Sequence, residues 1–194
     1  MQTSHPTALI VIGGFAGSGK STFSRRLSSE LRIPRLGSDT IGRTIRGSRG
    51  IREGDVDAYW IAYELLFRLC EEFLQSGVST ILDLSMGWAF QWRELDAITA
   101  RHPEVRVVPI VLRCPRELCL ERISRRYRRD PAYYDPPELY TSDPKLMAIW
   151  EYLEQLDRPG VSFVDAARPE DEVDGEIRAI VAALPTGTAA APGS

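Results

Sequence analysis

The segment Gly14-Phe-Ala-Gly-Ser-Gly-Lys20-Ser21 carries the clearest chemistry in the chain, because it matches the complete pattern G-x-x-x-x-G-K-S of a phosphate-binding loop. Its glycines let backbone N–H groups wrap a phosphate chain, and the N-terminus of a following helix adds a partial positive charge. Lys20 is expected to reach the β- and γ-phosphates of a nucleotide, and the Ser21 hydroxyl to hold Mg²⁺. The residues predicted to bind the nucleotide are Gly14, Ala16, Gly17, Ser18, Gly19, Lys20, Ser21 and Thr22.

Lysine is rare in this chain, which makes its use in the loop informative. Lys20 and Lys145 are the only lysines among 24 basic residues. A lysine presents a compact ammonium that works as a point charge, whereas arginine presents a planar fork. A lysine at this position of an arginine-rich chain therefore favours a phosphate contact.

Two carboxylates follow apolar stretches that read as buried strands. Asp39 comes just after the second of these, and Asp83 ends another in Ser79-Thr-Ile-Leu-Asp83. Residues at the carboxyl ends of parallel strands face the crevice where ligands bind. Asp39 is a candidate general base that accepts a hydroxyl proton, or else Ser38 or Asp39 caps a helix. Asp83 is a candidate to hold Mg²⁺ through water or to contact a substrate.

Four arginines follow the spacing of one helix face, since Arg122, Arg125, Arg126 and Arg129 stand at i, i+3, i+4 and i+7. Guanidinium groups gathered in this way repel one another unless an anion neutralises them. The Pro- and Tyr-rich stretch 130–137 that follows is typical of a mobile loop. Together these features predict a lid over about 122–142 that brings arginines to a transferring phosphate and excludes water. The alternative is a solvated basic face.

Short apolar strands alternate with helical segments along the chain, which predicts a parallel sheet covered on both faces. The strands are expected near 8–13, 34–38, 79–84, 105–112 and 161–165, and the helices near 20–31, 55–76, 88–101, 115–129, 143–156 and 170–183. The helix over 55–76 has an apolar stripe that predicts core rather than ligand contacts. That stripe consists of Val56, Tyr59, Trp60, Tyr63, Leu66, Phe67, Cys70, Phe73 and Leu74.

The composition bounds the possible functions. A chain of 194 residues with 43% hydrophobic and 26% charged residues is expected to form one domain over 1–184, followed by a disordered tail over 185–194. The net charge of −3 gives no overall attraction to nucleic acid or to anionic membranes. The beginning of the chain has no signal-peptide pattern, and no apolar run could span a membrane, so a cytoplasmic protein without a membrane partner is expected. Three cysteines without metal-ligand spacing and two histidines give little support to zinc chemistry.

The motifs resemble, in their order over about residues 8–182, a group of small ATP-binding P-loop kinases of AAA type. This group holds gluconate kinase, chloramphenicol phosphotransferase and the polynucleotide 5′-hydroxyl kinases. The motifs that carry the resemblance are the phosphate-binding loop, Ser38-Asp39 with Arg43, Gly77-x-x-x-Ile-Leu-Asp83, and Leu112-Arg-Cys-Pro115 with Glu121-Arg122.

The resemblance implies a P-loop NTPase fold of the α/β class, with a five-stranded parallel sheet of order 2-3-1-4-5 and a helical lid between the fourth and fifth strands. It implies ATP and Mg²⁺ as cofactors. By resemblance, Asp39 is the general base and Arg43 a substrate contact, while Arg122 and Arg126 are lid residues that contact the phosphates and Arg168 lies in a turn against adenine. The turn Leu84-Ser85-Met86 departs from some members of the group, which leaves its role open.

The leading hypothesis is a kinase that transfers the γ-phosphate of ATP to a hydroxyl of a small molecule, such as a nucleoside, a sugar or an antibiotic. A polynucleotide 5′-hydroxyl kinase is favoured by the series Arg43, Arg46, Arg49 and Arg52 but disfavoured by the acidic total charge. A regulatory ATPase without an acceptor is the third hypothesis, and it leaves Asp39 without a role, because a nucleotide switch needs no hydroxyl base.

Overall fold

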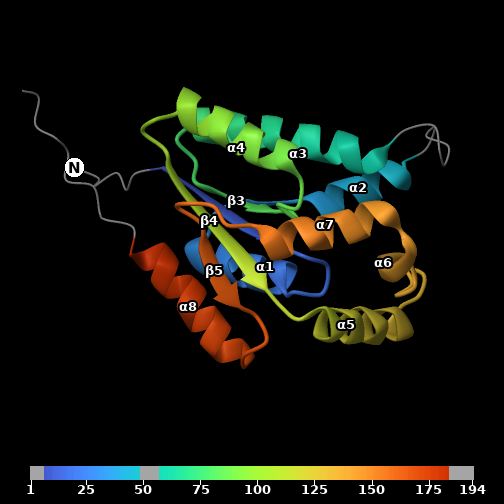
Figure 1. Ribbon diagram of the computed structural model, residues 1–194. Helices are drawn as coiled ribbons and strands as arrows, with labels where there is room; N and C mark the ends of the chain where they lie inside the picture. The colour runs from blue at the N-terminus through green and yellow to red at the C-terminus, as the bar shows by residue number, and fades with distance from the viewer. Residues whose placement is uncertain (1–6, 49–56, 184–194) are drawn as a thin grey trace, which may run out of the picture.

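The computed structural model describes residues 7–48 and 57–183, which form one five-stranded parallel sheet between two layers of helices (Figure 1). The sheet order is β2-β3-β1-β4-β5, which confirms the predicted order. The strands are β1 (Ala8–Gly14), β2 (Arg35–Gly37), β3 (Thr80–Asp83), β4 (Arg106–Arg113) and β5 (Ser162–Asp165). The helices are α1 (Lys20–Leu31), α2 (Ser38–Arg46), α3 (Ala58–Gln75), α4 (Ala89–Arg101), α5 (Arg116–Arg129), α6 (Leu139–Ser142), α7 (Pro144–Gln155) and α8 (Glu170–Ala182).

Strand β1 shows how the sheet separates two apolar layers. All seven of its residues are buried, so it reads as a continuous apolar run. Leu9 and Val11 point into a core shared with α3, α4 and α7, whereas Ile10 and Ile12 point into a core shared with α1 and α8. The alternation follows from the two-residue period of side chains along a strand. Figure 1 shows the corresponding helices on the two faces of the sheet.

Two helices were not predicted from the sequence. Helix α2 begins directly after β2, and the short α6 lies beyond the loop that follows α5. Neither has a long apolar stripe. Helix α2 is held by contact with α3, where Gly42 lets the backbone approach Tyr59 and Ala62. Tertiary packing rather than hydrophobic period therefore produces α2.

The prediction that the whole stripe of α3 is core is wrong for its first turns. Ala62, Leu66 and Cys70 are fully buried, as expected. Trp60 is 50% exposed, and Tyr63 is only partly buried. The N-terminal end of α3 lies near the carboxyl edge of the sheet, where side chains face a cavity instead of a strand. Val56, and the arginines Arg49 and Arg52 of the basic series, lie outside the described residues.

Helix α7 packs closely against the turn between β3 and α4. A Cβ at Gly87 would lie 2.4 Å from Cγ2 of Ile149, closer than two carbon atoms can approach. Ile149 is buried in the core that α7 shares with the sheet. Glycine at this position therefore allows α7 to pack against the turn between β3 and α4.

We predict that Gly87→Ala lowers the free energy of unfolding by about 1–3 kcal/mol, because the added methyl group overpacks the contact with Ile149. Gly175→Ala in α8 is the matched control, since a Cβ there meets no atom within 4 Å. Alanine in a helix interior should stabilise by up to about 1 kcal/mol. Urea denaturation of both variants measures the difference, and equal stability of the two would contradict the packing argument.

Candidate functional site

Parallel pairing brings the predicted site residues to one edge of the sheet. Ile12 and Gly37 both pair with Asp83, and Gly14 pairs with Leu112. The ends of β1, β2 and β3 are therefore in register, and the segments that leave them lie next to one another. This places the phosphate-binding loop, the start of α2 and the end of β3 together.

The phosphate-binding loop folds as its pattern predicts. Gly14, Gly17 and Gly19 have φ of 135°, 83° and 102°, a region that favours glycine. Gly14 N–H donates to the carbonyl of Ser85 at 2.9 Å, which fastens the start of the loop to the turn after β3. Gly19 is the N-cap of α1 and uses no side-chain cap. The first backbone N–H groups of α1 thus face the loop, where they could bind an anion.

Two cavities meet at this loop. The first, which we call the phosphate cavity, has a volume of about 520 Å³ and is lined by Gly17, Gly19, Ser21, Thr22 and Arg126 among others. The second, the aromatic cavity, has a volume of about 510 Å³ and extends toward α3, α4 and α7. The residues that line both are Ala16, Lys20, Asp39, Arg43, Asp135 and Tyr140.

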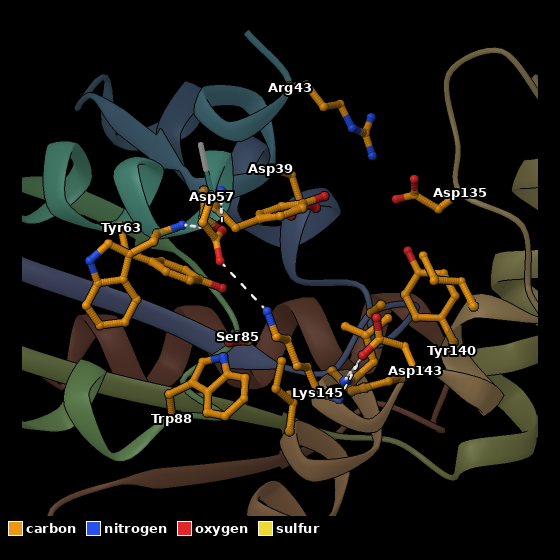
Figure 2. A pocket seen from close by; sticks show the side chains of 18 of the residues that line it. Asp39, Arg43, Asp57, Tyr63, Ser85, Trp88, Asp135, Tyr140, Asp143 and Lys145 are labelled. Atoms are coloured by element: carbon orange, nitrogen blue, oxygen red, sulfur yellow. Dashed lines mark hydrogen bonds and ion pairs between the residues drawn. The ribbon is translucent and has the colours of Figure 1, made fainter. Parts of the chain in front are cut away.

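Asp39 is exposed in the first turn of α2, at the junction of the two cavities. Gly37 is the N-cap of this helix, and no side chain caps it. The alternative in which Ser38 or Asp39 serves as the cap is therefore wrong. A carboxylate in the first turn is favoured by the helix dipole, and Figure 2 shows Asp39 reaching toward open space near Asp135 and Tyr140.

Lys20 also lies at the junction. Its Nζ donates to the carbonyl of Phe15 at 2.9 Å, so the ammonium is held against the loop. Ser21 follows at the start of α1 and lines the phosphate cavity. Loop amides, an ammonium and a hydroxyl form a donor set suited to a triphosphate with Mg²⁺.

Asp83 is almost fully buried and already has two partners. Ser24 Oγ donates to its Oδ2 at 2.9 Å, and Arg35 forms an ion pair with the same oxygen. Arg35 Nε also donates to Ser24 at 2.7 Å. The carboxylate lines the aromatic cavity while Arg35 lines the phosphate cavity. Asp83 thus ties β3 to α1 and β2, and Mg²⁺ could reach it only at the floor of the site.

The arginines of α5 divide into three groups instead of acting as one face. Arg126 and Arg129 line the phosphate cavity. Arg125 is exposed and pairs with Glu121 on its own helix at 2.5 Å. Arg122 donates to the carbonyls of Gly17 at 3.3 Å and Ala166 at 3.1 Å. It joins the loop to the turn after β5, a different place from the lid position expected for it.

Arg43 and Arg168 each have a partner in this structure. The Arg43 guanidinium lies 4.2 Å from the centre of the Tyr133 ring, which connects α2 to the loop between α5 and α6. Arg168 Nε donates to the carbonyl of Asp165 at 3.3 Å, and its guanidinium also pairs with Glu176 of α8. Arg168 holds the turn after β5 and does not line the phosphate cavity.

Sequence reasoning missed most of the aromatic cavity. Tyr63, Ser85 and Trp88 come from α3 and the β3–α4 turn, and Tyr140 and Lys145 come from α6 and α7 (Figure 2). Burial raises the pKa of Tyr63 to about 12, and a hydrogen bond to Ser85 lowers it in part. Proximity to strand ends could have pointed to Ser85, but no sequence pattern separates Tyr63 from a core tyrosine.

A pair of cysteines lies behind the loop. Cys119 is buried, as expected, and its backbone lies against Gly17. A hydrogen bond from the Cys119 thiol lowers the pKa of Cys114 to about 7, with a further contribution from Arg122. The same hydrogen bond and burial raise the pKa of Cys119. Cys114 is half-buried and lines a small cavity of about 260 Å³.

Neither a metal-binding cluster nor a membrane-spanning helix occurs among the described residues. No group of three or more His, Cys, Asp or Glu residues that could hold a metal ion occurs in the stretches 7–48 and 57–183. Within the same stretches, no helix has the length and hydropathy needed to cross a membrane.

Comparisons with known proteins agree with this architecture. The model of the family described as "AAA domain" matches residues 9–140. No curated protein matches the chain.

Solved structures of kinases share the fold. A sugar kinase from Janibacter has a TM-score of 0.63 at 22% identity, with 93% of this chain and 97% of that chain covered. A gluconokinase from Sinorhizobium meliloti has a TM-score of 0.57 at 21% identity, with 92% and 93% covered. A shikimate kinase from Aquifex aeolicus has a TM-score of 0.55 at 22% identity, with 90% and 96% covered. The chain therefore has the fold of the P-loop small kinases.

We predict that Cys114 reacts with iodoacetamide as a thiolate whose formation is half complete near pH 7. Because the folded-state pKa is lowered, the rate should rise as pH increases from 5 to 7 and change little above 8. Mass spectrometry of the labelled chain measures this rate. Cys114→Ser should remove the fast label, and a midpoint near the ordinary thiol value of about 8.5 would contradict the assignment.

Proposed function

We propose a function from the premise that this chain belongs to the AAA-domain family, whose model matches most of it. The protein is an ATP-dependent kinase that transfers the γ-phosphate to a hydroxyl group of a small molecule. The observation that carries the proposal is the junction of two cavities at Lys20 and Asp39. One cavity has the donors for a triphosphate, and the other has room for an acceptor.

The reaction follows from this placement. The triphosphate binds in the phosphate cavity, where the amides of the loop, Lys20 and the start of α1 neutralise its charge. The acceptor binds in the aromatic cavity with its hydroxyl beside Asp39. The acceptor oxygen attacks the γ-phosphorus, the bond to the β-phosphate oxygen breaks, and ADP leaves. Asp39 accepts the hydroxyl proton as the new P–O bond forms.

Ser21 would hold Mg²⁺, and Asp83 would act through water at the floor of the site, where Arg35 and Ser24 fix its orientation. The ion would supply positive charge to the β- and γ-phosphates. Arg126 faces the phosphate cavity and is the arginine of α5 that we assign to the transferred phosphate. Arg122 would hold the shape of the loop through Gly17.

We predict that Lys20→Ala and Asp39→Asn both abolish most turnover but differ in nucleotide binding. Lys20→Ala should lower kcat on the order of 10²-fold or more and weaken ATP binding, since it removes a phosphate contact. Asp39→Asn should lower kcat by about 10²–10⁴-fold and leave ATP affinity nearly unchanged, because it removes only the base. ADP formation with a panel of nucleosides, sugars and antibiotics as acceptors gives kcat, and calorimetry gives the ATP affinity.

Circular dichroism serves as the control for folding of both variants. Near-parent turnover by a folded Asp39→Asn protein would refute the base assignment. ADP formation that no acceptor accelerates would favour a regulatory ATPase instead. Long 5′-hydroxyl oligonucleotides that outcompete nucleosides, with affinity falling steeply with salt, would favour a polynucleotide kinase.

We predict that Arg126→Ala lowers kcat and kcat/KM by similar factors, about 10²-fold, because its charge is needed most in the transition state. Arg125→Ala is the matched control on the same helix, since Arg125 is exposed and pairs with Glu121. It should change either parameter less than about twofold. A rise in the KM for ATP alone would make Arg126 a ground-state contact.

A further inference from the structure

We infer that the acceptor is an alcohol that carries a flat aromatic ring and no negative charge. The inference rests on the proposed function, because it names the substrate class of the same site. It depends on the side chains that line the aromatic cavity and on the partners that its charged groups already have.

One wall of the cavity is aromatic. Phe90 of α4 lies 4.8 Å from Trp60 and 5.5 Å from Tyr63 of α3, measured between ring centres. All three rings line the cavity, and Trp60 is 50% exposed despite its size. Trp88 at the start of α4 also lines the cavity, and Figure 2 shows it on the same side as Tyr63. Exposed aromatic surface of this extent inside a concave site is typical of ring recognition.

Aliphatic side chains from a different part of the chain also line the cavity. They are Leu139 of α6 and Leu146 and Ile149 of α7. Helix α7 is held in place by its close packing against Gly87. The aromatic and aliphatic side chains together give the cavity an apolar surface that suits a flat ring, since burial of apolar surface is favourable.

The charged groups of the cavity disfavour an anionic acceptor. Arg46 donates to Tyr59 at 3.1 Å, and Arg43 lies over the ring of Tyr133. Lys145 Nζ is 3.9 Å from Asp57. Each of these three cations therefore has a contact within residues 7–48 and 57–183, although the Nε of Arg43 has no hydrogen-bond partner there.

Two of the five carboxylates that line the cavity show the opposite pattern. Asp39 and Asp135 have no hydrogen bond or ion pair to any other described side chain. The pKa of Tyr140 is raised first by burial and then by these two charges, while Arg43 lowers it. These two carboxylates add negative charge at the place where the acceptor hydroxyl must lie. A carboxylate substituent would be repelled there, whereas an ammonium beside Asp135 would be attracted.

A matched series of small alcohols tests ring and charge separately. L-Phenylalaninol has a ring and an ammonium, N-acetyl-L-phenylalaninol has a ring and no charge, 3-phenyllactate has a ring and a carboxylate, and L-alaninol has no ring. Thymidine and gluconate represent a nucleoside and a sugar acid. Calorimetric titration of each into the protein with Mg²⁺ and a non-hydrolysable ATP analogue measures binding without turnover.

We expect the two phenylalaninols or thymidine to bind at least 10-fold more tightly than L-alaninol, 3-phenyllactate or gluconate. The inference is overturned if 3-phenyllactate or gluconate binds as tightly as the uncharged and cationic ring compounds. It is also overturned if none of those ring compounds shows saturable binding. Tighter binding of thymidine than of the phenylalaninols identifies the ring as a nucleobase, and the reverse identifies it as an aryl group.

Two variants and one control test whether the ring compounds bind in this cavity. Phe90→Leu should raise the Kd of the best ring compound by about 3- to 10-fold, because it removes an aromatic partner while keeping apolar volume. Phe73→Leu makes the same change on α3 away from the cavity and should leave that Kd unchanged. Asp135→Asn should weaken L-phenylalaninol more than its N-acetyl form. Equal effects of Phe90→Leu and Phe73→Leu would overturn the assignment.

Separate measurement of ADP formation distinguishes the two proposals. Ring-dependent binding without ADP formation for any ring compound would refute the kinase function and keep the binding class. Gluconate-dependent ADP formation without binding of ring compounds would keep the kinase function and refute the ring.

Discussion

The parallel register of the sheet is the constraint on which the rest of the structure depends. Because β1, β2 and β3 run in the same direction, and Ile12 near the end of β1 is in register with the last residues of β2 and β3, Gly37 and Asp83, three chain segments leave the sheet at one edge. The helices that follow begin there, so the N-termini of α1 and α2 point at the same space. A site for an anion and a carboxylate that faces it are both consequences of this one arrangement.

The edge is held by a small buried polar cluster. Arg35, Asp83 and Ser24 connect β2, β3 and α1 directly beneath the two cavities. Breaking a buried ion pair by removing one partner costs about 3–5 kcal/mol, so the cluster has a structural role whatever metal contact Asp83 makes. Above it, the N–H of Gly14 donates a hydrogen bond to the carbonyl of Ser85. Met86, the residue after Ser85, is fully buried and has a φ of 55°. A non-glycine residue keeps such a strained backbone conformation only where the packing around it fixes that conformation.

Two linkages around the loop involve the elements expected to form a lid. Arg122 joins Gly17 to the turn after β5, and Arg43 joins α2 to Tyr133 in the loop before α6. Movement of the α5–α6 loop would therefore be felt at α2, which carries Asp39. This coupling gives a physical route by which closure over a nucleotide could orient Asp39, the proposed base.

Much of the fold followed from local signals. The apolar runs and the alternation of strand and helix predicted the five strands and six of the helices, because buried strands and amphipathic helices leave periodic patterns. The strand order came only from the resemblance to the small P-loop kinases. The sequence alone also determined that Lys20 and Ser21 stand at a helix start, since glycine spacing sets the loop conformation. Only the tertiary structure decided which arginines of α5 face the phosphate cavity. Arg125 and Arg126 point in directions about 100° apart around the helix axis, and the spacing alone does not say which direction faces the cavity. The tertiary structure also decided that Tyr59, Trp60 and Tyr63 line a cavity, because their stripe is periodic in the same way as a core stripe. What distinguishes them is the end of α3 that extends past the strands, and that is a property of packing between segments far apart in the chain.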